Sequence, residues 1–180
     1  RDKGLGADQI LVLSLDVTDW DALPGAVQAV LNRFGHIDLL INNAGVSQRS
    51  LCVDTDMEVY RQLMEVDVMG QIALTKAVLP HMLERGAGHI AVTASVAGKV
   101  GAPLRTGYCA AKHAVMGFFD ALRAEVEDQG VHVSTIVPGF IKTDIARNAL
   151  SGDGQTFDQE DEDIAGGMDV NECAEVVVRG

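Results

Sequence analysis

A tyrosine and a lysine four residues apart form a pair that could transfer a proton. Tyr108 and Lys112 belong to the segment YCAAK in a predicted helix, so both side chains lie on one face. A phenol with a pKa near 10 is a poor base at neutral pH, but a neighbouring ammonium favours the phenolate. The same spacing also fits an aromatic ring at the edge of the core beside a lysine whose amine reaches solvent.

Two further segments follow predicted strands. Ser95 comes after the apolar run 89–93, and Asn42-Asn43-Ala44-Gly45 comes after the run 37–41. Open parallel sheets bind ligands at the carboxyl ends of their strands. A hydroxyl there could hydrogen-bond a substrate oxygen, and small residues let the backbone approach a flat or anionic ligand. The alternatives are a serine that satisfies loop backbone and an ordinary turn.

Strands and helices alternate along the chain. Short apolar runs rich in β-branched residues predict buried strands at 10–15, 37–41, 89–93 and 131–137. Helical patterns cover 18–34, capped by Thr18 and ended by Gly35, then 57–84 with a kink at Pro80, 106–128, and 169–179. This alternation predicts an α/β fold with a doubly wound parallel sheet of the Rossmann type in three layers.

The composition favours one acidic domain over residues 1–180, since this length and a hydrophobic content of 47% suffice for one core. A net charge of -12 would repel a phosphate backbone, so no nucleic-acid partner is expected. Three separated cysteines support neither a disulfide framework nor a zinc site, so no metal is expected. No apolar run approaches the ~20 residues that span a bilayer, which favours a cytoplasmic location and leaves open an anchor before Arg1.

Together these motifs resemble the short-chain dehydrogenase/reductase family from about Ile10 to Arg179. The resemblance rests on LDVTD at 15–19, NNAG at 42–45, Ser95, YCAAK at 108–112 and PGFIKT at 138–143, in the family's order and spacing. It implies that Tyr108 exchanges a proton with the substrate oxygen while hydride moves between the substrate carbon and a nicotinamide. Lys112 would lower the tyrosine pKa, and Ser95 would position the substrate oxygen.

The resemblance also implies a binding site for NAD or NADP. Asp16 and Val17 would lie at the adenine, and Asn43, Ala44 and Gly45 against the adenosine side. Tyr108 and Lys112 would contact the nicotinamide ribose, and Pro138, Gly139, Ile141 and Thr143 would lie near the nicotinamide. A turn after a strand would equally explain Pro138-Gly139.

One residue departs from the family pattern inside the expected catalytic region. Asp67 stands where the family usually has an asparagine that holds a water beside the lysine. An ionised aspartate near Lys112 would partly offset the field that lowers the tyrosine pKa, which predicts a slower enzyme or one that needs higher pH. The alternative is an exposed helical acid without catalytic effect.

The glycine-rich strand, turn and helix that bind the pyrophosphate in this family have no match here, since Gly4 and Gly6 precede a predicted strand. The family strand order 3-2-1-4-5-6-7 would separate the first run here from the second by two strands. We therefore expect a sheet that is incomplete at both ends, from a fragment or truncated chain. The residues that distinguish NAD from NADP are not readable.

Residues 151–167 are polar and carry the acidic run 158–163, which predicts a mobile, solvated loop. The resemblance places this run at the family's substrate lid, so the alternative is a lid that disfavours anionic substrates. Family members commonly pair helices into dimers or tetramers, so a homo-oligomer is expected. The leading hypothesis is an oxidoreductase for a secondary alcohol or ketone of lipid, steroid or retinoid type. The rivals are a catalytically silent nucleotide-binding or interaction module and, less favoured, an epimerase or dehydratase.

Overall fold

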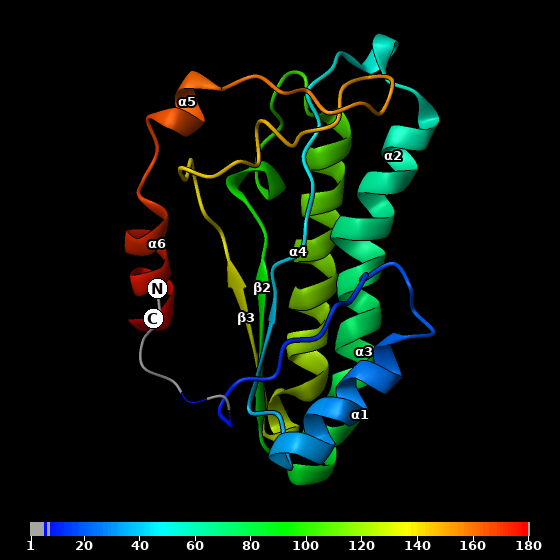
Figure 1. Cartoon of the computed structure of the whole chain (residues 1–180), viewed down its shortest axis with the longest axis vertical. Coiled ribbons are helices and arrows are strands. Elements are labelled where there is room, and N and C mark those ends of the chain that lie inside the picture. The colour runs from blue at the N-terminus through cyan, green and yellow to red at the C-terminus, as the bar shows by residue number, and fades with distance from the viewer. Residues whose placement is uncertain (1–5, 7, 180) are drawn as a thin grey trace.

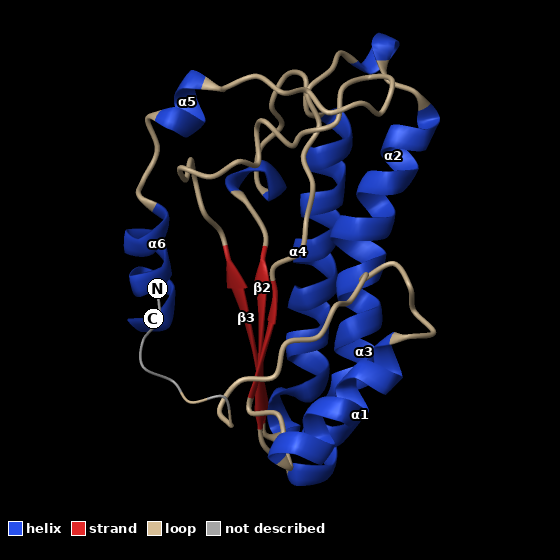
Figure 2. Ribbon diagram, viewed as in Figure 1, coloured by secondary structure: helices blue, strands red, loops and turns tan. Residues whose placement is uncertain are grey.

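The computed structural model describes residues 6 and 8–179, which form a parallel sheet flanked by helices (Figure 1, Figure 2). The strands are β1 (Leu39–Asn42), β2 (Gly88–Thr93) and β3 (Val131–Ile136), hydrogen-bonded in the order β1-β2-β3. Both neighbouring pairs are parallel. The predicted α/β fold with a parallel sheet is therefore confirmed, and so are three of the four predicted strands.

The prediction of a strand at residues 10–15 is wrong. This segment is extended but forms no strand, and Val12 is 85% exposed. A strand needs a neighbour with which to share backbone hydrogen bonds. In the family order two strands separate this segment from β1, and the described sheet contains neither. Leu13 and Leu15 instead line an apolar gap with Leu39 and Leu74.

The first helix, α1 (Leu23–Phe34), begins later than predicted. Thr18 does not cap it, because α1 starts after Ala22; the Thr18 backbone N–H and hydroxyl both donate to the Asp16 carboxylate in a preceding turn. Gly35 ends α1 as predicted, with a φ of 84° and its N–H bonded to the Leu31 carbonyl. A turn at residues 16–18 therefore stands where the sequence predicted the first turn of the helix.

The long predicted helix is a continuous run of α2 (Met57–Met64), a π-helical turn (Glu65–Gly70) and α3 (Gln71–Arg85). Its irregularity lies at Glu65–Gly70 and not at Pro80, which stays inside α3. Single π turns insert one residue into a helix and occur often at functional sites. Here the π turn buries Asp67.

The core lies between the sheet and the long helix α4 (Thr106–Val126), whose predicted extent is confirmed. Val115 and Phe119 of α4 pack with Ile90 and Val131 of the strands, and all four are nearly inaccessible. In Figure 1, α1, α3 and α4 lie on one side of the sheet and α6 (Val170–Arg179) lies on the other. The packing of α4 against the sheet thus fixes the position of Tyr108, which α4 carries, relative to the strand ends.

None of the helices among the described residues is long and apolar enough to cross a membrane. Residues 6 and 8–179 also contain no group of three or more His, Cys, Asp or Glu side chains arranged to hold a metal ion.

Candidate active site

Ser95 lies just beyond the carboxyl end of β2, on a short turn held against the end of β3. Its backbone is extended, and its Oγ accepts a hydrogen bond of 3.1 Å from the Ala97 N–H. The Val96 N–H donates to the Pro138 carbonyl at 3.0 Å, which joins this turn to the segment after β3. Because Oγ accepts from the backbone, its own proton can be donated to another oxygen, that of Tyr108 or of a ligand.

The turn also rests directly on α4. A Cβ added at Gly98 would come within 2.8 Å of the Lys112 carbonyl oxygen, so only glycine allows this approach. The Lys112 Nζ donates to the Thr93 carbonyl at 3.1 Å and lies 5.6 Å from the centre of the Tyr108 ring. The structure therefore brings Ser95, Tyr108 and Lys112 together.

Asp67 is buried beside Lys112, so the alternative of an exposed helical acid is wrong. Its side chain is 0% exposed. One carboxylate oxygen accepts a 2.7 Å hydrogen bond from the Val46 N–H, and the other lies 3.4 Å from the Lys112 Nζ. A Cβ added at Gly45 would lie 3.3 Å from that second oxygen and 3.4 Å from Nζ. The NNAG backbone therefore covers an ion pair.

Burial controls the proton affinities of this site. It raises the pKa of the Asp67 carboxyl, while Lys112 and the Val46 N–H act in the opposite direction. Burial also raises the pKa of Tyr108; the Ser95 hydrogen bond lowers it, and the Asp67 charge raises it further. The lowering expected from Lys112 is thus not what this structure shows, because its ammonium lies beside Asp67 and the phenol is desolvated.

A buried polar row supports the NNAG segment from below. The Gln71 amide donates to the Ala44 carbonyl at 2.8 Å, and the Asn42 amide donates to the Thr75 hydroxyl at 2.9 Å. The sequence interpretation missed Gln71 and Thr75. Their signal is the spacing of Asp67, Gln71 and Thr75, which places three polar residues on one helical face.

Gln48 is a second residue that the sequence interpretation missed. It is completely buried, and its carbonyl oxygen accepts a 2.7 Å hydrogen bond from the Gly107 N–H in the first turn of α4. Its amide group donates to the hydroxyls of Ser50 and Thr55, each at 3.1 Å. Gln48 thereby fixes the start of α4 one residue before Tyr108.

Replacing Gln48 should destabilise the protein. In Gln48→Ala the Gly107 N–H stays buried without an acceptor, so we expect the free energy of unfolding to fall by about 1–3 kcal/mol. Urea unfolding of the variant and the parent measures this. Gln28→Ala, which loses only an exposed hydrogen bond to Asn32 on α1, is the control. A loss no larger than that of the control would contradict the assigned role.

The structure groups only some of the predicted cofactor-binding residues. Asn43, Ala44 and Gly45 form an exposed backbone surface over Lys112, and Pro138 contacts the Ser95 turn. Val17 packs on Gly70 in the π turn. Four predicted residues lie outside this group: Asp16 binds Thr18, Ile141 pairs with Met168, and Gly139 and Thr143 are exposed. Gly4 lies outside the described residues.

The pattern of the short chain dehydrogenase family matches residues 2–154. The chain belongs to this family. It is similar to human dehydrogenase/reductase SDR family member 7, with 50% identity over 145 residues, covering 80% of this chain and 43% of the human protein. It is also similar to zebrafish (Danio rerio) dehydrogenase/reductase SDR family member 7B, with 41% identity, covering 93% of this chain and 54% of that protein.

Two solved structures share the fold. A short-chain dehydrogenase from Streptomyces avermitilis matches with a TM-score of 0.83 and 28% identity, covering 95% of this chain and 65% of that one. The structure of ElxO with NADP bound matches with a TM-score of 0.73 and 30% identity, covering 75% and 55%. The family and this NADP-bound structure agree with the predicted cofactor class, NAD or NADP. The chain spans about half the length of the curated relatives it matches.

Proposed function

We propose that this chain is the catalytic part of an NAD(P)-dependent oxidoreductase that interconverts a secondary alcohol and a ketone, with lipid, steroid or retinoid-like compounds as the substrate class. The observation that carries the proposal is the meeting of Ser95, Tyr108 and Lys112 at the carboxyl end of β2. Family membership supports the reaction class, and the apolar substrate class rests on sequence resemblance alone.

The residues present fit the nicotinamide half of the cofactor. Residues 43–45 are exposed, and Gly45 lies beside the Lys112 ammonium, since a Cβ added at Gly45 would be 3.4 Å from Nζ. Lys112 would hold the nicotinamide ribose, and residues 43–45 would lie against the adenosine side of the cofactor. When bound, the nicotinamide would accept hydride from an alcohol or give hydride to a ketone.

In alcohol oxidation, the Tyr108 phenolate takes the proton of the substrate hydroxyl while hydride leaves the carbon that bears this hydroxyl. The O–H bond and the C–H bond break together, and a carbonyl forms. The Ser95 hydroxyl donates a hydrogen bond to that oxygen while it carries negative charge. Reduction runs the same steps backwards, with Tyr108 as the acid.

The test is reduced-nicotinamide absorbance in the whole protein with a panel of secondary alcohols and ketones. A change in absorbance that requires both the nicotinamide cofactor and an alcohol or ketone supports the proposal. Binding of NADP(H) without redox turnover would favour the silent module, and product formation without net change in nicotinamide would favour an epimerase or dehydratase.

Loss of the Ser95 hydroxyl should slow the reaction. Removing one donor to a developing oxyanion costs about 10²-fold in kcat, so Ser95→Ala should lose that factor and keep its affinity for NADP(H). Ser95→Thr retains a hydroxyl and should recover part of the loss. Equal rates in the alanine and threonine variants would contradict the role.

We also propose that the protein forms a homo-oligomer through α4. Ala110, Gly117 and Ala121 lie exposed on this helix, and such small residues allow two helices to approach closely. Sedimentation analysis of the whole protein tests the proposal, and a monomer at micromolar concentration would contradict it.

A further inference from the structure

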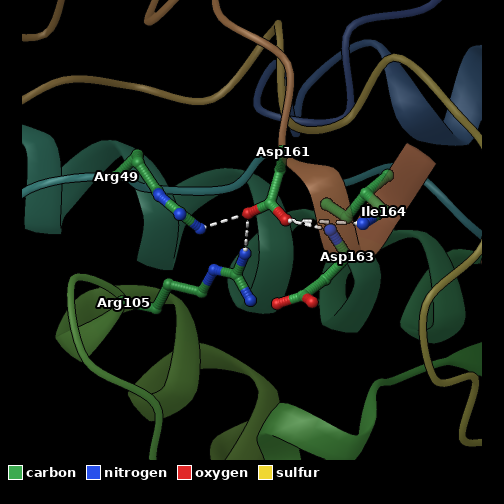
Figure 3. A network of polar contacts seen from close by, with 5 residues as sticks. All are labelled: Arg49, Arg105, Asp161, Asp163 and Ile164. Atoms are coloured by element: carbon green, nitrogen blue, oxygen red, sulfur yellow. Dashed lines mark hydrogen bonds and ion pairs between the residues drawn. The ribbon is translucent and has the colours of Figure 1, made fainter. Parts of the chain in front are cut away.

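Two arginines from different segments bind one buried carboxylate. Asp161 is 4% exposed at its side chain, and one of its oxygens contacts Arg49 and lies 2.8 Å from an Arg105 nitrogen (Figure 3). The other oxygen accepts from the N–H groups of Asp163 and Ile164 at 3.0 and 3.4 Å, which caps the short helix α5 (Glu162–Ala165). The prediction that the whole acidic run is solvated is therefore wrong at Asp161.

This cluster joins three segments that surround the candidate site. Arg49 follows the NNAG segment, Arg105 immediately precedes α4, and Asp161 belongs to residues 151–167. In Figure 1 the yellow and orange part of the chain that includes residues 151–167 crosses the end of the molecule where the strands terminate. The carboxylate therefore ties this crossing segment to both flanks of the site.

Backbone hydrogen bonds hold the same segments in register. The Arg49 N–H donates to the Leu150 carbonyl at 2.8 Å, and the Leu150 N–H donates to the Ser47 carbonyl at 2.8 Å. These bonds anchor the beginning of the crossing segment. Its later part, from Phe157 onward, has Asp161 as its buried charged anchor.

We propose that Asp161 is a positioning residue that latches residues 151–167 onto Arg49 and Arg105 and thereby encloses the substrate beside Tyr108. This inference rests on the proposed function. Arg105 lies three residues before Tyr108 on the same chain segment, so the latch meets the catalytic helix at its first turn. Loss of the carboxylate would also leave two guanidinium groups facing each other without a counter-charge, which favours opening of the segment.

The structural test is hydrogen exchange of the whole protein with NADP bound. In Asp161→Asn the amides of residues 157–165 should exchange at least about tenfold faster than in the parent. Glu160→Gln, at an exposed acid of the same run, should match the parent. Exchange in Asp161→Asn equal to that of Glu160→Gln would overturn the latch.

The kinetic test uses phenanthrenequinone, an aromatic diketone, as the probe substrate. We expect Asp161→Asn to raise KM by about tenfold with less than about a twofold change in kcat, because the latch acts on enclosure and not on proton transfer. Asp161→Glu should recover part of the KM. Arg49→Gln should also raise KM, and the double variant should add little to either single variant.

The outcomes separate the latch from the proposed function. If the parent does not reduce any member of the carbonyl panel, the proposed function fails, and hydrogen exchange still decides the latch. If Asp161→Asn lowers kcat and the melting temperature together without raising KM, the cluster has a purely structural role and the latch proposal is overturned.

Discussion

Tyr108→Phe should lose about 10³-fold in kcat while its affinity for NADP(H) stays within about twofold of the parent. General acid–base catalysis by a positioned side chain typically contributes 10²–10⁴-fold, and only the phenolic oxygen can exchange the proton at this position. Phenylalanine keeps the buried ring and therefore the packing beside Ala97 and Cys109. The loss should appear in the chemical step, measured in a single turnover at saturating cofactor.

The chain supplies a matched control for this variant. Tyr60 is its other tyrosine, and its hydroxyl bonds to the Thr106 hydroxyl at 2.9 Å, at the same end of α4. Tyr60→Phe removes a hydroxyl nearby without touching the proposed proton transfer, so its kcat should stay near that of the parent. A comparable loss in both variants, or more than about one tenth of the parent kcat in Tyr108→Phe, would contradict the assignment.

Asp67→Asn should make alcohol oxidation at neutral pH about tenfold faster. Burial raises the pKa of Tyr108 above its usual value, and the nearby Asp67 charge raises it further. Removing that charge lowers the pKa of Tyr108, so the phenolate forms at lower pH. Oxidation needs the phenolate and rises with pH through this pKa, so the rising limb of the profile should move to lower pH. Asparagine keeps an oxygen to accept from the Val46 N–H.

Glu65→Gln provides the comparison for Asp67→Asn. Glu65 is an acid of the same π turn but is only partly buried and has no ion pair with Lys112 among the described contacts. Its pH profile should match that of the parent. If Asp67→Asn leaves both the rate and the profile unchanged, the Asp67 carboxylate has no influence on the proton transfer.

The parts of the structure that the sequence predicted correctly depend on local pattern. The strands of the sheet are short runs rich in β-branched and apolar residues, and α4 has a clear helical period, followed by a 3₁₀ turn that Gly130 ends. Tyr108 and Lys112 share a face because they are four residues apart, and Ser95 reaches them because parallel strands end at one edge. These relations do not require knowledge of distant partners.

The parts that the sequence did not predict depend on distant or competing partners. Gln48 becomes informative only once it lies under Gly107, and Asp161 becomes a buried anchor only once Arg49 and Arg105 approach it. Residues 10–15 have a strand composition but lack a neighbouring strand in the described sheet. A single local preference was also misjudged, since Thr18 bonds to Asp16 and does not cap α1.

The proton affinity of Tyr108 also depends partly on local sequence pattern and partly on distant residues. The spacing of Tyr108 and Lys112 is visible in the sequence, whereas the burial of the phenol and the position of Asp67 between the NNAG segment and Lys112 are not. Burial and a nearby carboxylate act against the ammonium. A motif therefore identifies the groups that react, and their surroundings decide the pH at which they do so.

Transfer of deuterium from NADPH deuterated at the hydride position tests the proposed chemistry most directly. The whole protein is incubated with a secondary-alcohol-forming ketone that it reduces, and the alcohol product is analysed by mass spectrometry. Hydride transfer beside Tyr108 requires one deuterium on the new carbinol carbon, with the label reaching product about 10³-fold more slowly in Tyr108→Phe. Binding of NADPH without label in any product, or equal labelling by the parent and Tyr108→Phe, would contradict it.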